Sequence, residues 1–194
     1  MRRFRLPLAL LAVILVAAVV FWLASTSRAA TETPAYTVIR TDKECEIRDY
    51  PALTVAMTPM ADGGMDSSFG QLFGFITGAN AASEKIAMTS PVLVEPGKTM
   101  SFIMPANTVV KGVPEPSGKE VKLEKMEAAR MAILRFSGGR TPENEKTAIT
   151  KLTGWLAANG ILAQSGPLFA YYDPPWTPTF LRRNEVMVRI AKDD

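Results

Sequence analysis

The chain contains segments in which apolar and polar residues alternate with a period of two and others in which apolar residues recur with helical spacing. The clearest alternation is in residues 45–50, where Cys45, Ile47 and Asp49 fall on one side of a strand. Other apolar segments are bounded by turn residues. They predict strands at residues 36–40, 52–59, 85–95, 100–105, 119–127, 129–138, 167–175 and 185–190.

The segment SFGQLFGFITGAN, residues 68–80, has apolar residues at the i, i+3, i+4, i+7 positions of a helix. We expect a short helix that ends near Gly78. The face predicted to be buried carries Phe69, Leu72, Phe73 and Ile76. Phe75 falls about a third of a turn from the centre of that face, so it is expected either at the edge of the core or in contact with a ligand.

A second helix is predicted over residues 140–160, with Thr141 as its N-cap and Pro142 in its first turn. Its apolar stripe consists of Ile149, Leu152, Trp155 and Leu156. Apart from the first strand at residues 36–40, each half of the folded region therefore runs strand, strand, helix, strand, strand. This repeated order predicts an α+β fold of two pseudo-symmetric halves, in which a largely antiparallel, barrel-like sheet has both helices on its outside.

The N-terminal residues differ in composition from the rest of the chain. Three arginines within the first five residues precede an uncharged apolar run, residues 6–24, and polar residues follow it. This order is typical of a targeting segment, so residues 1–30 are interpreted as a signal peptide or an N-terminal membrane anchor. Residues 31–35 would be a linker, and residues 36–194 the folded domain.

The arginines before the apolar run indicate which side of the membrane the domain occupies. Positive residues flanking such a run tend to stay in the cytoplasm, so the domain is expected on the other side. An anchored chain would sit in a bacterial-type inner membrane and face the periplasm. A chain cleaved near residue 29 would be secreted to the periplasm, and the sequence leaves these two outcomes open.

Composition excludes several classes of function. The 194 residues carry a net charge of only +3, without the basic stripe typical of proteins that bind nucleic acid. There is no histidine and a single cysteine, so neither a histidine-based catalytic triad nor a zinc site of Cys and His can form. Glycine-rich phosphate loops are also missing. We therefore expect a protein that is not an enzyme, with Cys45 as a small core residue.

One C-terminal segment, YYDPPWTPTFLRRNEVMVRI, is richer in aromatic residues and prolines than a surface loop needs. The prolines stiffen the chain around Trp176 and Phe180, and a rigid aromatic side chain loses little entropy on binding. Arg182 and Arg183 follow, and guanidinium groups suit carboxylates and phosphates. The segment is either a binding surface or a packing corner in which Trp176 plugs one end of the barrel.

Four segments together resemble the SOUL haem-binding protein family: CEIRDYPALTVA, SFGQLFGFITGAN, KIAMTSPV and GPLFAYYDPPWTPTFLRRNEVMV. The similarity covers nearly all of residues 36–190. It implies a distorted β-barrel of two related halves flanked by two helices, and binding of haem or another tetrapyrrole in a shallow apolar groove. The residues that this resemblance and the aromatic segment point to are Leu72, Phe75, Ile76, Met88, Tyr171, Trp176, Phe180, Arg182 and Arg183.

The sequence departs from this family at one position that matters for haem chemistry. Some members carry a histidine, proposed as an iron ligand, where this chain has Asp49. Any axial ligand would have to be tyrosine, methionine, cysteine or water. We expect apolar contacts and arginines, without histidine ligation, to hold the tetrapyrrole. The alternative is a membrane-tethered module that contacts a protein or lipid and binds no haem, and no protein partner is indicated.

Overall fold

The structure is a computed structural model that describes residues 10–11, 13–16, 19, 31–60 and 64–192. The predicted signal peptide or anchor lies almost entirely outside these residues. Within the described part of the chain, no helix is both long and apolar enough to span a membrane. The predicted linker, residues 31–35, is attached to the domain, because the Glu32 carbonyl accepts a hydrogen bond from the Ser90 amide at 2.8 Å.

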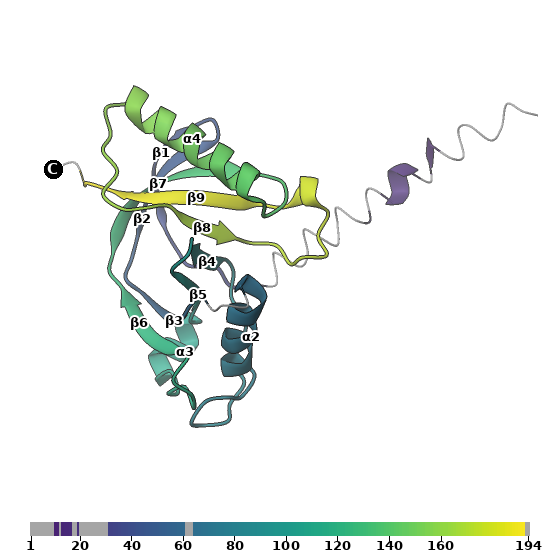
Figure 1. Cartoon of the computed structure of the whole chain (residues 1–194), viewed down its shortest axis with the longest axis vertical. Coiled ribbons are helices and arrows are strands. Elements are labelled where there is room, and N and C mark those ends of the chain that lie inside the picture. The colour runs from purple at the N-terminus through teal and green to yellow at the C-terminus, as the bar shows by residue number, and fades with distance from the viewer. Residues whose placement is uncertain (1–9, 12, 17–18, 20–30, 61–63, 193–194) are drawn as a thin grey trace, which may run out of the picture.

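Nine antiparallel strands form one curled sheet in the order β1-β2-β7-β9-β8-β4-β5-β3-β6 (Figure 1). β1 and β6 are its edges, so among the described residues the sheet stays open as a half-barrel and does not close into the expected barrel. The strands are β1 (Thr37–Asp42), β2 (Cys45–Tyr50), β3 (Leu53–Pro59), β4 (Val92–Glu95), β5 (Thr99–Ile103), β6 (Lys122–Met126), β7 (Ala129–Phe136), β8 (Leu168–Tyr171) and β9 (Asn184–Ile190).

The strand order is symmetric about the pairing of β4 with β8. Outward from this pair, the order is β8-β9-β7-β2 on one side and β4-β5-β3-β6 on the other. The first half comprises β2 to β5 and the second comprises β6 to β9. Outward from the centre, each side of the sheet contains the third, fourth and second strands of one half, and then the first strand of the other half. The two halves therefore exchange their first strands, β2 and β6, and β1 extends one edge.

The two long helices, α2 (Gly64–Ile76) and α4 (Pro142–Ala158), pack on the outer face of the curl (Figure 1). The main core lies between these helices and the sheet, and Leu152 and Leu156 of α4 are buried in it. The predicted start of α4 is confirmed, because the Thr141 hydroxyl accepts a hydrogen bond from the Asn144 amide at 3.2 Å. The remaining helices, α3 (Ala106–Lys111) and η1 (Thr179–Leu181), are short.

The predicted inner face of α2 is wrong by part of a turn. Leu72 and Ile76 are buried as expected, but the third large side chain in the core is Phe75, which is 1% exposed. Phe69 and Phe73, predicted to point inward, are 38% and 48% exposed. The helix is apolar on most of its circumference, so the sequence pattern alone allowed either stripe to face the sheet.

Two predicted strands are shorter than expected. Residues 85–91 do not belong to a strand, and β4 begins only at Val92. β8 ends at Tyr171, four residues before the predicted end, because Pro174 and Pro175 have no amide proton to donate to a neighbouring strand. In both places apolar residues continue past the strand without the period-two alternation of a paired strand.

Candidate functional site

A cavity of about 590 Å³ lies between α2 and the segment of residues 172–176. This volume falls within the range of about 300–1,000 Å³ that is typical of small-molecule sites. Residues from both halves of the chain line it, together with Thr31 of the predicted linker. They are Thr31, Met65, Asp66, Phe69, Phe73, Met88, Thr89, Ser90, Val92, Met100, Arg140, Tyr171, Tyr172, Asp173, Pro174, Pro175 and Trp176.

One wall of the cavity is the side of α2 that faces away from the core. Phe69 and Phe73 are one helical turn apart, so their rings lie on the same side, stacked with 5.9 Å between centroids. Phe69 also packs edge-on against Phe102 of β5, at 5.2 Å. The sheet thus holds one ring of the pair in place, and both remain accessible from the cavity.

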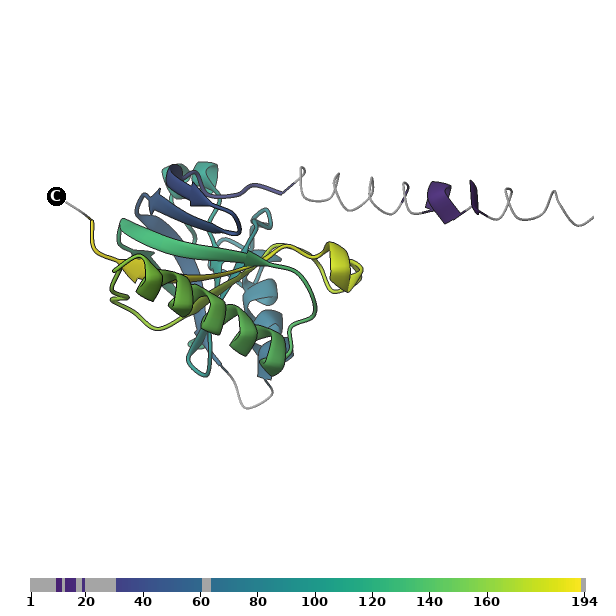
Figure 2. The ribbon, with the colours of Figure 1, turned by 90° about the horizontal axis from the view of Figure 1, so that it is seen from above.

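The opposite wall is the proline-rich segment that carries Trp176. This side chain is 81% exposed, so it does not plug an end of the sheet as one interpretation of the sequence expected. The segment is held by polar contacts instead. The Arg183 amide donates to the Asp173 carboxylate at 2.6 Å, and the Arg182 guanidinium donates to the Thr177 carbonyl at 2.8 Å. The segment projects from the body of the domain (Figure 2).

The base of the cavity includes Tyr171 and Met88. Tyr171 is buried, and its hydroxyl donates to the Glu145 carboxylate at 2.5 Å. Burial, and then the hydrogen bond with this carboxylate, raise the pKa of Tyr171 well above its ordinary value. The phenolate that would bind iron is therefore disfavoured. Met88 is partly buried and packs beside the core, and its thioether is the softest ligand atom at this base.

Arg140 brings a positive charge to the cavity. Its guanidinium carbon lies 4.1 Å from the centroid of the Tyr171 ring, which is a cation–π contact. Burial lowers the pKa of this guanidinium, although an arginine stays charged near neutral pH. Arg140 has no hydrogen bond or ion pair within the described residues, so its donors are free for an anion. Arg140 is not predicted from the sequence, because a lone arginine before a helix cap has no distinctive pattern.

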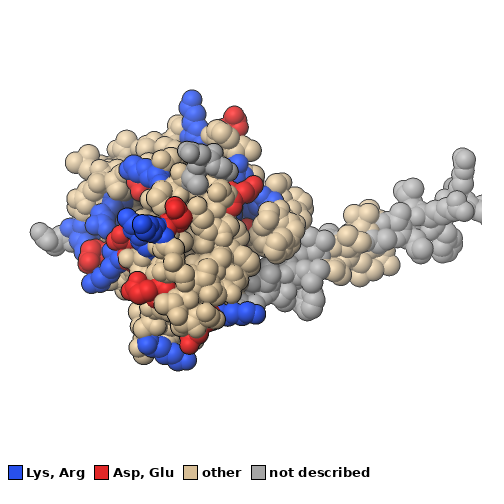
Figure 3. All heavy atoms as spheres, turned by 60° about the horizontal axis from the view of Figure 1, so that its bottom comes forward, with Lys and Arg blue, Asp and Glu red and all other residues tan. Residues whose placement is uncertain are grey.

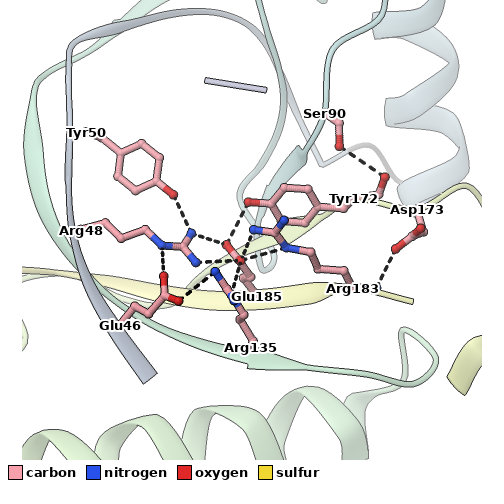
Figure 4. A network of polar contacts seen from close by, with 9 residues as sticks. All are labelled: Glu46, Arg48, Tyr50, Ser90, Arg135, Tyr172, Asp173, Arg183 and Glu185. Atoms are coloured by element: carbon pink, nitrogen blue, oxygen red, sulfur yellow. Dashed lines mark hydrogen bonds and ion pairs between the residues drawn. The ribbon is translucent and has the colours of Figure 1, made fainter. Parts of the chain in front are cut away.

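Arg182 and Arg183 do not line the cavity. Arg182 holds the backbone of the proline-rich segment, as described above. Arg183 points to the inner face of the curl, where it bonds Glu185 at 2.7 Å and lies over the Tyr172 ring at 4.0 Å (Figure 4). Both guanidinium groups already have partners, which leaves Arg140 as the better placed of the three for a ligand carboxylate.

Arg183 belongs to a buried network of charges on the inner face of the sheet (Figure 4). Arg48 of β2 and Glu185 of β9 are fully buried and form a two-pronged ion pair with distances of 2.9 and 3.1 Å. Glu46 accepts from Arg48 at 2.6 Å, and Arg135 contacts both glutamates. Because every charge is paired, we assign this network to the structure of the curl.

The remaining predicted residues lie away from the cavity. Leu72, Phe75 and Ile76 are in the core beneath α2, and Phe180 is 74% exposed on η1 without lining the cavity. Cys45 is buried in the core, where burial raises its pKa to about 11.

Asp49, which stands where some SOUL proteins carry histidine, accepts two hydrogen bonds from Arg130 at 2.9 and 3.0 Å and does not line the cavity. No group of three or more acidic or cysteine side chains in the described residues is arranged to hold a metal ion.

A second, smaller cavity of about 210 Å³ lies on the inner face of the curl. Its apolar lining includes four methionines, Met57, Met126, Met131 and Met187. This volume is below the usual range for drug-sized ligands. The larger cavity beside α2 is therefore the stronger candidate for a binding site.

A family model described as SOUL heme-binding protein matches residues 31–189. The chain therefore belongs to the SOUL family, as the sequence resemblance predicted. The match covers both long helices and all of the curled sheet except the last residue of β9. No curated protein sequence matches the chain.

Solved structures with the same fold are distant in sequence. The C-terminal domain of EcmrR has a TM-score of 0.55 and 14% identity, over 81% of this chain and 99% of that domain. A hydrolase from Listeria innocua has a TM-score of 0.55 and 10% identity, over 79% of this chain and 94% of the other. EcmrR in a complex with DNA has a TM-score of 0.53 and 14% identity, over 95% of this chain and 70% of the EcmrR chain. At these identities the likeness concerns the fold alone.

Proposed function

We propose that the protein binds haem or a related tetrapyrrole in the cavity between α2 and residues 172–176. The observation that carries this proposal is the aromatic lining of the cavity. Phe69 and Phe73 of α2 and Trp176 of the proline-rich segment line the same cavity of about 590 Å³, and all three side chains are exposed. A flat porphyrin ring has two large apolar faces, which stack on aromatic side chains placed in this way. Membership of the SOUL family supports the same ligand class.

Apolar contact, and not iron coordination, is proposed to supply most of the affinity. The chain has no histidine. The Tyr171 hydroxyl is bonded to Glu145, and Cys45 lies in the core away from the cavity. Of the residue types that could bind iron here, the thioethers of Met65, Met88 and Met100 line the cavity, and none of the three has a hydrogen-bonding partner among the described residues. Haem bound in this site would have weak or no axial ligation from the protein.

Arg140 is the proposed partner of the ligand's carboxylates. Porphyrins of the haem type carry two propionates, and a guanidinium group binds a carboxylate through two parallel hydrogen bonds. Arg140 lies at the cavity, and its donors have no partner within the described residues. This contact would orient the ring without contributing redox chemistry.

The protein is further proposed to act by binding and not by catalysis. The cavity brings together aromatic, methionine and hydroxyl side chains with one arginine and two aspartates, and the contacts given for these described residues include no paired nucleophile and base. The arginines and the apolar run of the N-terminus support a location outside the cytoplasm, at the inner membrane or in the periplasm.

The test is a titration of the full chain in detergent with haemin and with iron-free protoporphyrin. Similar affinities for the two are expected, because the rings and carboxylates are the same. Trp176→Ala should weaken both by roughly ten- to a hundredfold, since burying a large apolar side chain contributes about 1.5–3 kcal/mol. Arg140→Gln should weaken both less, and its effect should shrink at high salt.

Phe180→Ala is the matched control. Phe180 is an exposed aromatic residue four positions from Trp176, but it does not line the cavity, so its replacement should leave porphyrin affinity unchanged. Unchanged affinity in Trp176→Ala would contradict the proposed site. Haemin binding that disappears when iron is removed would show that coordination dominates, and the proposed mode of binding would then be wrong.

A further inference from the structure

The exposed aromatic residues of the domain gather at one end of it. Phe69 and Phe73 of α2 and Trp176 line the mouth of the candidate site, and Phe180 is close in sequence on η1. Trp176 and Phe180 are the most exposed aromatic residues in the described part of the chain, at 81% and 74%. We call these four residues the aromatic end. An aqueous environment gives no reason for such a concentration of apolar surface at one site.

Thr31, the first residue of the described domain, lies at this same end. Thr31 lines the same cavity as Trp176. The next residue, Glu32, is fixed to the domain, because its carbonyl accepts from the Ser90 amide and its carboxylate accepts from the Ala106 amide at 2.9 Å. In Figure 2 the described residues before β1 run toward the side on which the segment of residues 172–183 projects.

Only six residues, 25–30, separate Thr31 from the uncharged apolar run of residues 6–24. Six fully extended residues span at most about 20 Å. If the apolar run crosses a bilayer, the mouth of the cavity is held within that distance of the point where the run leaves the hydrocarbon. The polar interface of a bilayer is itself several ångströms deep on each side.

We propose that the aromatic end inserts into the interfacial region of the phospholipid bilayer that the N-terminal run crosses, so that the cavity opens toward lipid. A ligand would then enter from the membrane and not from water, and it would belong to the flat, lipid-soluble molecules with a polar edge. The membrane contact rests on the positions of the aromatic residues and of Thr31. Only the nature of the ligand rests on the proposed function.

Tryptophan suits this environment, because its ring is apolar and its indole N–H can remain hydrated at the level of the headgroups. The prolines around Trp176 fix the segment, so little conformational entropy is lost on insertion. On the one face that Figure 3 shows, the charged side chains gather on the left of the domain and fewer appear on its right, the side on which Figure 1 shows α2, which agrees with this orientation.

The experiment measures contact between Trp176 and lipid in the full chain, reconstituted in vesicles of phosphatidylcholine and phosphatidylglycerol. Trp22→Phe first removes the tryptophan within the apolar run, which leaves Trp155 and Trp176 as emitters. Phosphatidylcholine brominated on its acyl chains should quench part of the fluorescence. Adding Trp176→Phe should abolish this quenching, because the Trp155 indole donates to Asp42 at the contact of α4 with β1.

A relocated tryptophan provides the matched control. Leu162 is also highly exposed, but it precedes Ala163, which pairs with Ile190 at the far end of β9 from the proline-rich segment. Leu162→Trp in the chain that carries Trp22→Phe and Trp176→Phe should show no quenching by brominated lipid. Equal quenching at this position would mean that the domain has no preferred orientation, and it would overturn the proposal.

Two further outcomes would also overturn the proposal. The first is a Trp22→Phe chain that brominated lipid does not quench. The second is quenching that persists after Trp176→Phe. Chemical crosslinking of the same vesicles would show whether a second copy of the chain covers Trp176 instead of lipid. A haemin titration in these vesicles separates the two hypotheses, because quenching without haem binding would contradict the proposed function alone.

Discussion

At the scale of single residues, burial decides which charged groups are available to a ligand. Arg182 and Arg183 are adjacent in sequence and look equivalent there, yet one holds a loop backbone and the other pairs with a buried glutamate. Arg140, which the sequence does not distinguish, is the arginine that lines the cavity, and its donors have no partner within the described residues. Such differences arise from contacts across the sheet, so a linear pattern cannot reveal them.

The buried glutamate on the inner face of the curl predicts a dependence of stability on pH. Burial acts to raise the pKa of Glu185, but the hydrogen bonds and charges of Arg48 and Arg183 outweigh it and hold the pKa below its ordinary value of 4.5. Between the folded and unfolded pKa values, the unfolded chain binds more protons. The stabilising contribution is therefore fully present above about pH 4.5 and is lost as the pH falls through the folded pKa.

We expect the free energy of unfolding, measured with urea, to fall as the pH is lowered from 5 to 3. Glu185→Gln should be less stable at neutral pH, because Arg48 is then buried without its full complement of charge. Its unfolding free energy should also fall less steeply below pH 4.5. A slope identical to that of the unaltered chain would show that other carboxylates cause the acid sensitivity.

At the scale of elements, α2 has two faces with different roles. Substitutions at Phe75 and Phe73 should therefore affect different properties. Phe75 is almost fully buried, so Phe75→Ala should lower the free energy of unfolding by about 3–5 kcal/mol. Phe73 is half exposed at the cavity, so Phe73→Ala should cost much less stability but weaken porphyrin binding. Urea unfolding and a protoporphyrin titration on the same samples would check both effects. Equal losses of stability would contradict the assignment of the faces.

The elements themselves were largely predictable, and their edges and orientations were not. Alternation predicted β2 over residues 45–50, and a cap, a proline and an apolar stripe predicted α4. The sequence predicted that the strand of β4 begins at residue 85, because the residues before β4 include apolar side chains. Ile86 is indeed buried in the core, but it belongs to an irregular segment. The buried face of α2 was predicted wrongly for a similar reason. Phe69 and Phe73 line the cavity, but sequence periodicity treats all apolar positions as core.

At the scale of the whole molecule, the site depends on both halves of the chain. The first half supplies Phe69, Phe73 and Met88, and the second supplies Arg140 and Trp176. These walls come together because β4 pairs with β8 at the centre of the sheet. The order of elements was visible in the sequence. The exchange of β2 and β6 between the halves was not, since strand pairing over such separations leaves no local pattern.

The exchange of first strands predicts that neither half can fold alone. β3 of the first half lies between β5 and β6, and β7 of the second lies between β2 and β9. Separating the halves would expose the edges of both sheets and open the core on each, so each fragment buries too little surface to be stable. A protease site inserted after Gly118, in an exposed connection between β5 and β6, allows this to be tested in the assembled protein.

We expect the cleaved full chain in detergent to keep its circular dichroism spectrum and to stay associated, because the contacts of β2 and β6 remain. After separation in urea, residues 1–118 and 119–194 should each lack a cooperative unfolding transition on removal of the denaturant. Mixing them should restore the spectrum and any porphyrin binding. A fragment that unfolds cooperatively alone would show that one half carries a complete core, in conflict with the exchanged strands.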